Sequence, residues 1–201
     1  MNDWTGNSNS IYKILGASNH TNEERQNEDY YATDPSAAEW LIKIEDLDKN
    51  CPIWECACGE NHLANVFMQN GYTVRTSDII KRVPDAEVID FLRYEKEWIG
   101  NIITNPPFKY AAEFCEHAMN IIYPGMKVCM FLKLQFLEGK SRRSLFEKYP
   151  PKTVWVSSSR ILCAKNGDFQ KMRDGGGSAV AYAWFVWEKG YKGDSVIKWF
   201  N

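Results

Sequence analysis

Short apolar segments alternate with amphipathic ones along most of the chain. The apolar segments are typical of strands and cover residues 52–55, 73–77, 87–89, 101–104, 127–133, 153–156 and 179–187. Between them, apolar residues at helical spacing predict a helix of about 12 residues that begins at Pro35, and helices that cover 63–69, 110–121 and 141–149. This order predicts an α/β fold, in which a doubly wound and mostly parallel sheet carries helices on both faces.

The domain organisation follows from length and from two polar stretches. Residues 1–28 are rich in Asn, Ser and Glu, so we expect a flexible arm. Residues 29–201 are enough for a single α/β domain. The connection 158–178 contains three consecutive glycines, and we expect it to form a long, structureless loop that faces the substrate.

The composition is that of a globular protein, with 44% hydrophobic and 25% charged residues. No run of apolar residues is long enough to predict a membrane span. The first residues lack the basic start and apolar segment of a secretory signal, so we expect a cytoplasmic protein with reduced thiols. Cys56 and Cys58 suggest a metal site, but no second Cys/His pair follows at a suitable spacing, and we expect no metal.

The charges are distributed unevenly along the sequence. Residues 1–126 carry 10 Lys and Arg against 20 Asp and Glu, whereas residues 127–173 carry 11 against 3. A basic segment in an otherwise acidic chain is typical of a face that meets a polyanion. A solvated surface with clustered charges gives the same pattern, and composition alone leaves both interpretations open.

Polar residues follow four consecutive predicted strands. They are Glu55, Asp78, Asp90 and Asn105. In a doubly wound sheet, ligands bind at the carboxyl ends of the strands. Four polar residues in succession at that edge therefore predict a binding site.

The tetrapeptide Asn105-Pro106-Pro107-Phe108 carries the most specific chemistry. Methylation of an aromatic amine requires that a weakly nucleophilic NH2 group be polarised. The Asn side-chain oxygen and a proline-locked backbone carbonyl can both accept its hydrogens, since proline fixes φ and removes a competing donor. The following aromatic ring can stack on a base that has left its duplex. The alternative is a proline turn after a buried strand, with Phe108 in the core.

The sequence resembles the class I S-adenosylmethionine-dependent methyltransferases that act on amino groups, in which such a tetrapeptide follows the fourth strand. Within that group it is similar to the small adenine-specific DNA methyltransferases of phages and prophages. The resemblance covers residues 29–199 and is carried by five segments: Tyr30–Pro35, Glu55–Gly59, Ser77–Ile79, Asp90–Leu92 and Asn105–Phe108. It implies a Rossmann-like sheet with an antiparallel C-terminal strand.

The resemblance also implies S-adenosylmethionine as the cofactor. Thr33 and Pro35 would approach its methionine carboxylate, and Glu55 would lie near the methionine moiety. Asp78 would accept hydrogen bonds from the ribose hydroxyls, although capping or turn formation also accounts for an acid at this position.

Three further positions complete the implied cofactor site. Gly59 would let the backbone come close to the cofactor, Asp90 would bind the adenine amino group, and Phe91 would pack on the ring. Capping or turn formation also accounts for Asp90. The family often has a second glycine two positions after Gly59, whereas this chain has Asn61. Asn tolerates left-handed backbone angles, so the turn can be kept.

The resemblance implies that the catalytic residues are Asn105, Pro106, Pro107 and Phe108, and that the substrate is adenine N6 in DNA. The basic segment then supplies candidate phosphate contacts, namely Arg142, Arg143, Arg160, Lys165, Lys171 and Arg173. Other interpretations stay open. They are a methyltransferase for an RNA base, one for a glutamine amide of a protein, and a cofactor- or DNA-binding module without turnover.

Overall fold

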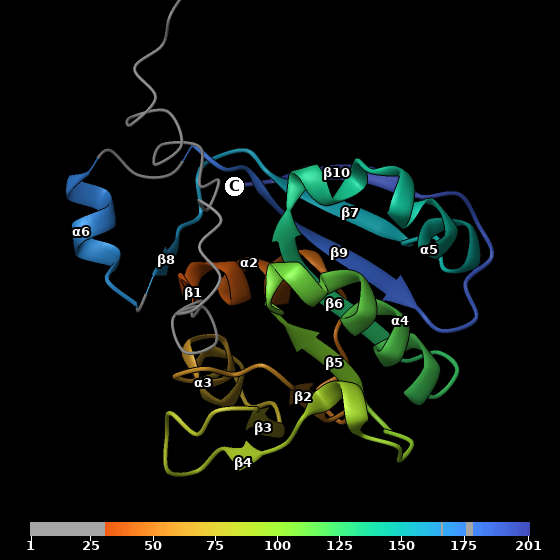
Figure 1. Ribbon diagram of the computed structural model, residues 1–201, viewed down its shortest axis with the longest axis horizontal. Helices are drawn as coiled ribbons and strands as arrows, with labels where there is room; N and C mark the ends of the chain where they lie inside the picture. Colours follow the sequence, from red (N-terminus) through yellow and green to blue (C-terminus); the bar gives the residue numbers. More distant parts are fainter. Residues whose placement is uncertain (1–30, 166, 176–178) are drawn as a thin grey trace, which may run out of the picture.

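The computed structural model describes residues 31–165, 167–175 and 179–201. Its main sheet has eight strands in the order β10-β7-β9-β6-β5-β2-β3-β4 (Figure 1). The strands are β2 (Ile53–Glu55), β3 (Val74–Asp78), β4 (Glu87–Val88), β5 (Asn101–Thr104), β6 (Lys127–Lys133), β7 (Thr153–Ser157), β9 (Tyr182–Glu188) and β10 (Val196–Phe200). Only β9 runs antiparallel to its neighbours β6 and β7. The predicted fold class is therefore confirmed, while β10, which lies parallel to β7, was not predicted.

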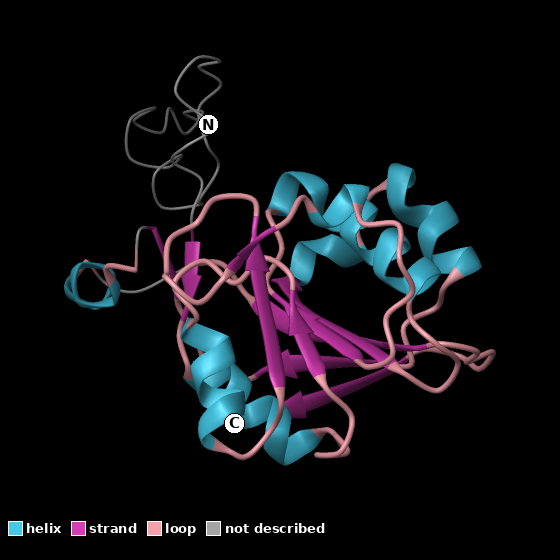
Figure 2. Ribbon diagram, turned by 90° about the horizontal axis from the view of Figure 1, so that it is seen from below, coloured by secondary structure: helices cyan, strands magenta, loops and turns pink. Residues whose placement is uncertain are grey.

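Helices cover both faces of the sheet, as Figure 2 shows from below. They are α2 (Ser36–Ile44), α3 (His62–Gln69), α4 (Ala111–Ile121), α5 (Arg143–Lys148) and α6 (Phe169–Asp174). Four short 3-10 helices accompany them: η1 (Phe91–Arg93), η2 (Phe108–Tyr110), η3 (Leu134–Leu137) and η4 (Lys140–Arg142). None of the helices in the described ranges has both the length and the apolar character needed to cross a membrane.

The sheet separates two apolar cores. Along β6, Met130 packs into the core under α4, and the next residue, Phe131, packs into the core under α2 and α3. Along β9, Phe185 packs into the core under α4, and the preceding residue, Trp184, packs into the core under α2 and α3. Because both faces are covered, the central strands are almost continuously apolar. This is why the sequence showed them as apolar runs rather than as alternating patterns.

A second, two-stranded sheet was not predicted. Strand β1 (Tyr31–Thr33) pairs antiparallel with β8 (Cys163–Lys165), and Thr33 lies opposite Cys163. Helix α6 follows β8 and lies beyond it, away from the main sheet (Figure 1). The expectation of a structureless connection over 158–178 is therefore wrong, because three-residue strands and a six-residue helix are too short to show a period. The predicted arm at 1–28 lies outside the described residues.

Two predicted helices are longer than the observed ones. The helix after Pro35 ends at Ile44, and the helix predicted from residue 141 begins as α5 only at Arg143, because η4 precedes it. The predicted strand over 179–187 forms over Tyr182–Glu188. The strands β5 and β6 have the predicted bounds, and these two strands lead to the site described below.

The start of β5 fixes its position between β2 and β6. The backbone N–H of Asn101 donates to the carbonyl of Pro52 at 2.8 Å, and the Asn101 side-chain oxygen accepts from the N–H of Lys127 at 2.8 Å. Gly100 is buried against this junction, where a Cβ atom would overlap the Pro52 carbonyl oxygen. A residue without a side chain is therefore required for β5 to lie this close to the β2 entry.

We predict that Gly100→Ala destabilises the protein by about 1–3 kcal/mol, because the added methyl must displace backbone rather than a flexible side chain. Urea denaturation measures the effect as a lower midpoint with an unchanged slope. A midpoint equal to that of the wild type would contradict the close approach of β5 to the β2 entry.

Candidate functional site

The carboxyl ends of β2, β3 and β5 meet at one edge of the sheet, as the sequence predicted for three of the four polar residues. Glu55 ends β2, Asp78 ends β3, and Asn105 follows β5 directly. Thr33, the last residue of β1, lines a cavity at this edge and binds Asn105. This narrow cavity lies between them, lined by Thr33, Glu55, Cys58, Asn105 and neighbouring residues.

Glu55 is buried and only partly satisfied. Its side chain is 2% exposed, and its Oε2 atom has no hydrogen-bond partner among the described residues. Burial raises the pKa of this carboxyl well above its usual range, a backbone hydrogen bond from Ala64 partly offsets that rise, and the nearby Asp78 adds to it. A buried carboxyl with an open oxygen is suited to a cationic or hydrogen-bond-donating ligand.

The turn after β2 joins the cavity to Asp78. Gly59 has a φ of 55°, and its N–H donates to Oδ2 of Asp78 at 2.9 Å. Asn61 has a φ of 63°. An asparagine therefore occupies the left-handed position at which the methyltransferases that this sequence resembles often have glycine. The expectation that this turn survives the substitution is confirmed.

The two acids beyond β2 both take part in local turns. Asp78 is 8% exposed, and its Oδ1 accepts from the N–H of Ile80 at 3.0 Å and lies 3.4 Å from Arg82 Nη1. Asp90 precedes η1 and accepts from the N–H of Leu92 at 3.2 Å. These bonds are the turn and capping roles weighed from the sequence, and they leave acceptor capacity on each carboxylate.

Phe91 lies in the core, whereas a neighbouring apolar residue is exposed. The Phe91 ring is 2% exposed and packs against Trp54 and Phe114, with ring centroids 5.3 and 4.9 Å away. Ile79 directly follows Asp78, and 64% of it is exposed. No role was predicted for Ile79, although an apolar residue after an acidic strand end is a signal that could have identified it.

Asn105 is oriented by β1. Its Nδ2 donates to Oγ1 of Thr33 at 2.7 Å and lies 3.8 Å from the Sγ of Cys163, which pairs with Thr33 across the small sheet. Burial raises the pKa of the Cys163 thiol to about 12, so it stays neutral. The Asn105 Oδ1 atom is buried and has no partner among the described residues. The amide therefore presents an open acceptor.

Phe108 lies at the border between the core and a second cavity. Its ring centroid is 6.0 Å from those of Tyr31 and Tyr182, and the Lys133 ammonium lies 4.4 Å above the ring. The Phe108 ring is half-buried, so the alternative interpretation, in which Phe108 is an ordinary core residue, does not fit. The second cavity, of about 280 Å³, is lined by Phe108, Leu132, Lys133, Gln135, Phe136 and Arg142.

Buried polar atoms without partners concentrate at this edge. Glu55, Asn61 and Asn105 each contribute one such oxygen. An unsatisfied buried polar atom costs about 1–3 kcal/mol, so a fold rarely keeps several of them together without use. Two of these oxygens, those of Glu55 and Asn105, line one cavity, and that of Asn61 belongs to the turn that follows β2, which indicates a ligand site.

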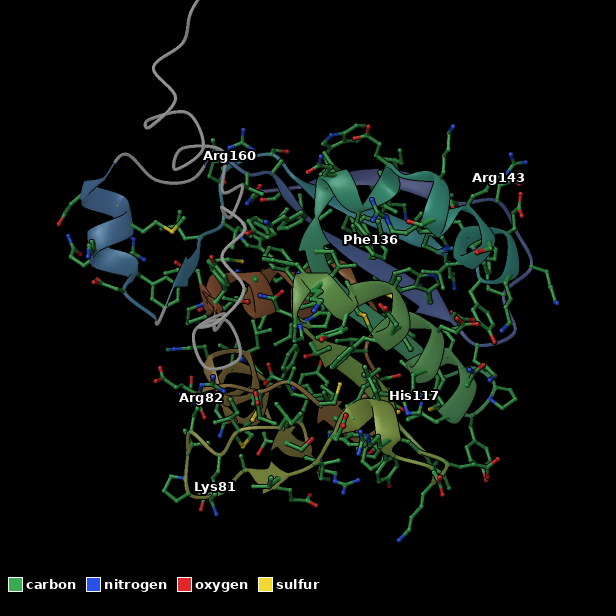
Figure 3. All side chains as sticks on the ribbon, viewed as in Figure 1. Lys81, Arg82, His117, Phe136, Arg143 and Arg160 are labelled. Atoms are coloured by element: carbon green, nitrogen blue, oxygen red, sulfur yellow. The ribbon has the colours of Figure 1, made fainter. Side chains whose placement is uncertain are left out.

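The predicted phosphate contacts fall into separate groups. Arg143 forms an ion pair with Glu147 at 2.7 Å and lies at the opposite end of the molecule from Arg160 (Figure 3). Arg173 pairs with Asp34 at 3.0 Å. Arg160 and Lys171 are exposed.

Two further candidates among the predicted contacts differ from these. Arg142 binds backbone carbonyls, and the side chain of Lys165 is not among those that the structure describes.

The described residues place no three His, Cys, Asp or Glu side chains so that they could share a metal ion. The cysteines among them are free thiols.

No protein-family model matches the sequence, and no curated protein is similar to it at a significant level. Solved structures do match. A Listeria monocytogenes protein, proposed to be a class I S-adenosylmethionine-dependent methyltransferase, superposes with a TM-score of 0.57 at 12% identity, over 82% of this chain and 63% of its own. Magnesium protoporphyrin IX methyltransferase from Synechocystis, solved with its bound cofactor, gives 0.51 at 12% identity, over 77% of each chain.

The M protein of the type I restriction enzyme EcoKI matches with a TM-score of 0.57 at 12% identity, over 83% of this chain and 45% of its own. The fold is that of the class I methyltransferases. At these identities the similarity establishes the fold, and the chain spans 63% of the Listeria protein and less than half of the EcoKI M protein. In this methyltransferase fold, the edge that carries Glu55, Asp78 and Asn105 is the one at which a doubly wound sheet binds its ligands.

We predict that Glu55→Gln changes how the stability of the free protein depends on pH. Between the ordinary carboxyl pKa and the raised pKa, the folded state holds a proton that the unfolded state releases, so wild-type stability falls as pH rises. One proton corresponds to a slope of up to about 1.4 kcal/mol per pH unit, which the variant lacks. Thermal unfolding from pH 4 to 9 measures it, and parallel curves for both proteins would contradict the raised pKa.

Proposed function

We propose that the protein is an S-adenosylmethionine-dependent methyltransferase that modifies an exocyclic amino group of a nucleobase, adenine N6 in DNA. The observation that carries the proposal is the open Oδ1 of Asn105, which is buried and has no partner in the described part of the chain, while its Nδ2 is held by Thr33. The fold supports the cofactor class, and the tetrapeptide supports an amino group as the acceptor of the methyl group.

Asn105 and Pro106 would act on the substrate amine. An amine nitrogen conjugated to an aromatic ring is a poor nucleophile, because its lone pair is delocalised. Hydrogen bonds from its two hydrogens to Oδ1 of Asn105 and to the Pro106 carbonyl would draw the nitrogen toward tetrahedral geometry and return the lone pair. Since these bonds strengthen as positive charge develops on the nitrogen, they stabilise the transition state more than the bound substrate.

The residues at the sheet edge fit S-adenosylmethionine, which supplies an electrophilic methyl group when bound. The unpartnered Glu55 oxygen matches the cationic amino group of the cofactor's methionine moiety. Thr33, which ends β1, and Pro35, two residues later, would lie near the carboxylate of that moiety. Gly59 and Asp78 would meet the ribose.

The adenine end of the cofactor would lie beyond Asp78. Asp90 would bind the adenine amino group, and the exposed Ile79 would be covered by the ring. Covering an apolar side chain removes it from water, which stabilises the complex by about 25 cal/mol per Å² of apolar area. The Phe91 ring is packed in the core, and it would support the adenine-binding residues from the core side.

Three features support adenine in DNA as the substrate. The Thr33-Asp34-Pro35 segment before the first strand of the main sheet resembles the small phage and prophage enzymes, and the M protein of EcoKI has the same fold. The cavity beside Phe108 provides an aromatic face for a base rotated out of its duplex. If RNA is the substrate instead, the methyl-transfer assay described below would detect a methylated RNA base.

The exposed cations of the 158–178 connection would hold the nucleic acid. Arg160 and Lys171 lie on the segment that also carries β8, whose Cys163 contacts Asn105. Contacts from such cations to phosphates give affinity without sequence information.

We predict that Asn105→Ala lowers the turnover number for methyl transfer by about 100- to 1000-fold, as for the loss of one transition-state hydrogen bond in other enzymes. Thr33→Val should lower it by about tenfold, because the amide loses the bond that fixes its orientation. The assay follows transfer of a labelled methyl group from S-adenosylmethionine to plasmid DNA and, in parallel, to total RNA.

Cofactor affinity, measured by calorimetry, should stay close to the wild-type value for Asn105→Ala, since Asn105 serves the substrate amine. Near-normal turnover in a folded Asn105→Ala protein would contradict the amino-methylation mechanism. Transfer to RNA alone would replace DNA by RNA as the substrate.

We predict that binding of duplex DNA weakens steeply with salt, with log K falling by about 0.9 per log[salt] for each phosphate neutralised. Replacing Arg160 and Lys171 together by Gln should flatten that slope by about 1–2. Arg143→Gln is the matched control, because Arg143 is paired with Glu147 and lies away from Arg160 (Figure 3), so the proposed phosphate contacts do not include it. Equal slopes in all three proteins would show that these cations are only solvated.

A further inference from the structure

The segment after β6 forms one wall of the cavity beside Phe108. Lys133 ends β6, and η3 then brings Gln135 and Phe136 to the cavity. Phe136 is 8% exposed and packs edge-on against Phe146 and Phe185. Gln135 is exposed, and its side chain forms no hydrogen bond with another described residue. A base stacked on Phe108 would meet this wall.

The guanidinium of Arg142, which also lines the cavity, binds the backbone of this wall. Its Nε donates to the carbonyl of Phe136 at 2.8 Å, and its Nη2 donates to the carbonyls of Gln135, at 3.3 Å, and of Glu138. The charged group also lies 5.1 Å from the centre of the Phe136 ring. One side chain thus binds three carbonyls of a four-residue stretch.

Gly139 makes room for this arrangement. Its φ is 120°, a value that side-chain-bearing residues rarely adopt, and a Cβ atom there would lie 2.8 Å from Nη2 of Arg142. The turn at Gly139 brings η4 back so that Arg142 can reach the residues just before it. Gly139 and Arg142 therefore depend on each other.

These contacts differ from those of a phosphate-binding arginine. Two of the three guanidinium nitrogens donate to backbone carbonyls, and the side chain is half-buried. The adjacent Arg143 is exposed, and its side chain binds only Glu147 among the described residues, which makes it a natural comparison. Lysine has a single charged nitrogen and no planar fork, so it cannot reproduce the pattern that Arg142 makes.

We propose that Arg142 is a positioning residue that fixes the Gln135–Glu138 wall of the target-base pocket, and that it does not bind phosphate. The proposal rests on the proposed function, since it assigns the cavity beside Phe108 to the substrate base. Arg142 acts through the Phe136 and Gln135 backbone, and the base meets the side chains that this backbone orients.

The test compares Arg142→Lys, Arg142→Gln and Gly139→Ala with Arg143→Gln as the control, using plasmid DNA and labelled S-adenosylmethionine. We expect the first three variants to lose about tenfold or more in the turnover number, because a shift of the wall misplaces the base. The Michaelis constant for DNA and the salt slope of binding should stay near wild type, and Arg143→Gln should match wild type throughout.

Normal turnover in Arg142→Lys, or a salt slope lowered by about 0.9 in Arg142→Gln, would overturn the proposal and indicate a phosphate contact. A wild-type protein that methylates neither DNA nor RNA would overturn the proposed function instead. In that case, the positioning role of Arg142 is tested by hydrogen exchange of residues 134–139 in the free protein. Faster exchange in Arg142→Lys and Gly139→Ala supports the positioning role, and exchange equal to that of the wild type overturns it.

Discussion

The hydrogen bond from Asn105 to Thr33 is the interaction on which the account of the site depends. An asparagine amide has a donating and an accepting end, and the bond to the Thr33 hydroxyl commits the donor to β1. The oxygen is left buried and open at the carboxyl edge of β5. Strand β1 is held in place by β8, so a two-stranded sheet of three residue pairs decides which atom of Asn105 is left open at the cavity.

The same edge keeps several polar groups in an unfavourable state. Glu55 is buried with a raised pKa, and oxygens of Glu55, Asn61 and Asn105 have no partners within residues 31–165, 167–175 and 179–201. Each lowers the stability of the free protein, and each is relieved when a ligand with matching groups binds. The apolar cores on both faces of the sheet, which contain Trp54 and Trp184, supply the stability that tolerates this.

The sequence predicted every strand of the main sheet except β10, as well as the polar residues at the strand ends, because buried parallel strands appear as apolar runs and their carboxyl ends share an edge. It also predicted that Asn61 could take the left-handed position. It did not predict the pairing of β1 with β8, which joins residues about 130 positions apart through strands too short to show a period. Nor could it tell Arg142 from Arg143, because the partners of Arg142 are backbone carbonyls brought within reach by the turn at Gly139.

The central claim is that the open oxygen of Asn105 serves the amino group of a nucleobase. Its most direct test is mass spectrometry of the nucleosides recovered from DNA and RNA that have been incubated with the protein and isotopically labelled S-adenosylmethionine. The account predicts a labelled methyl group on an exocyclic nitrogen, as N6-methyladenine from DNA. A label found only on a ring nitrogen, a carbon or an oxygen, or no label in either nucleic acid, would contradict it.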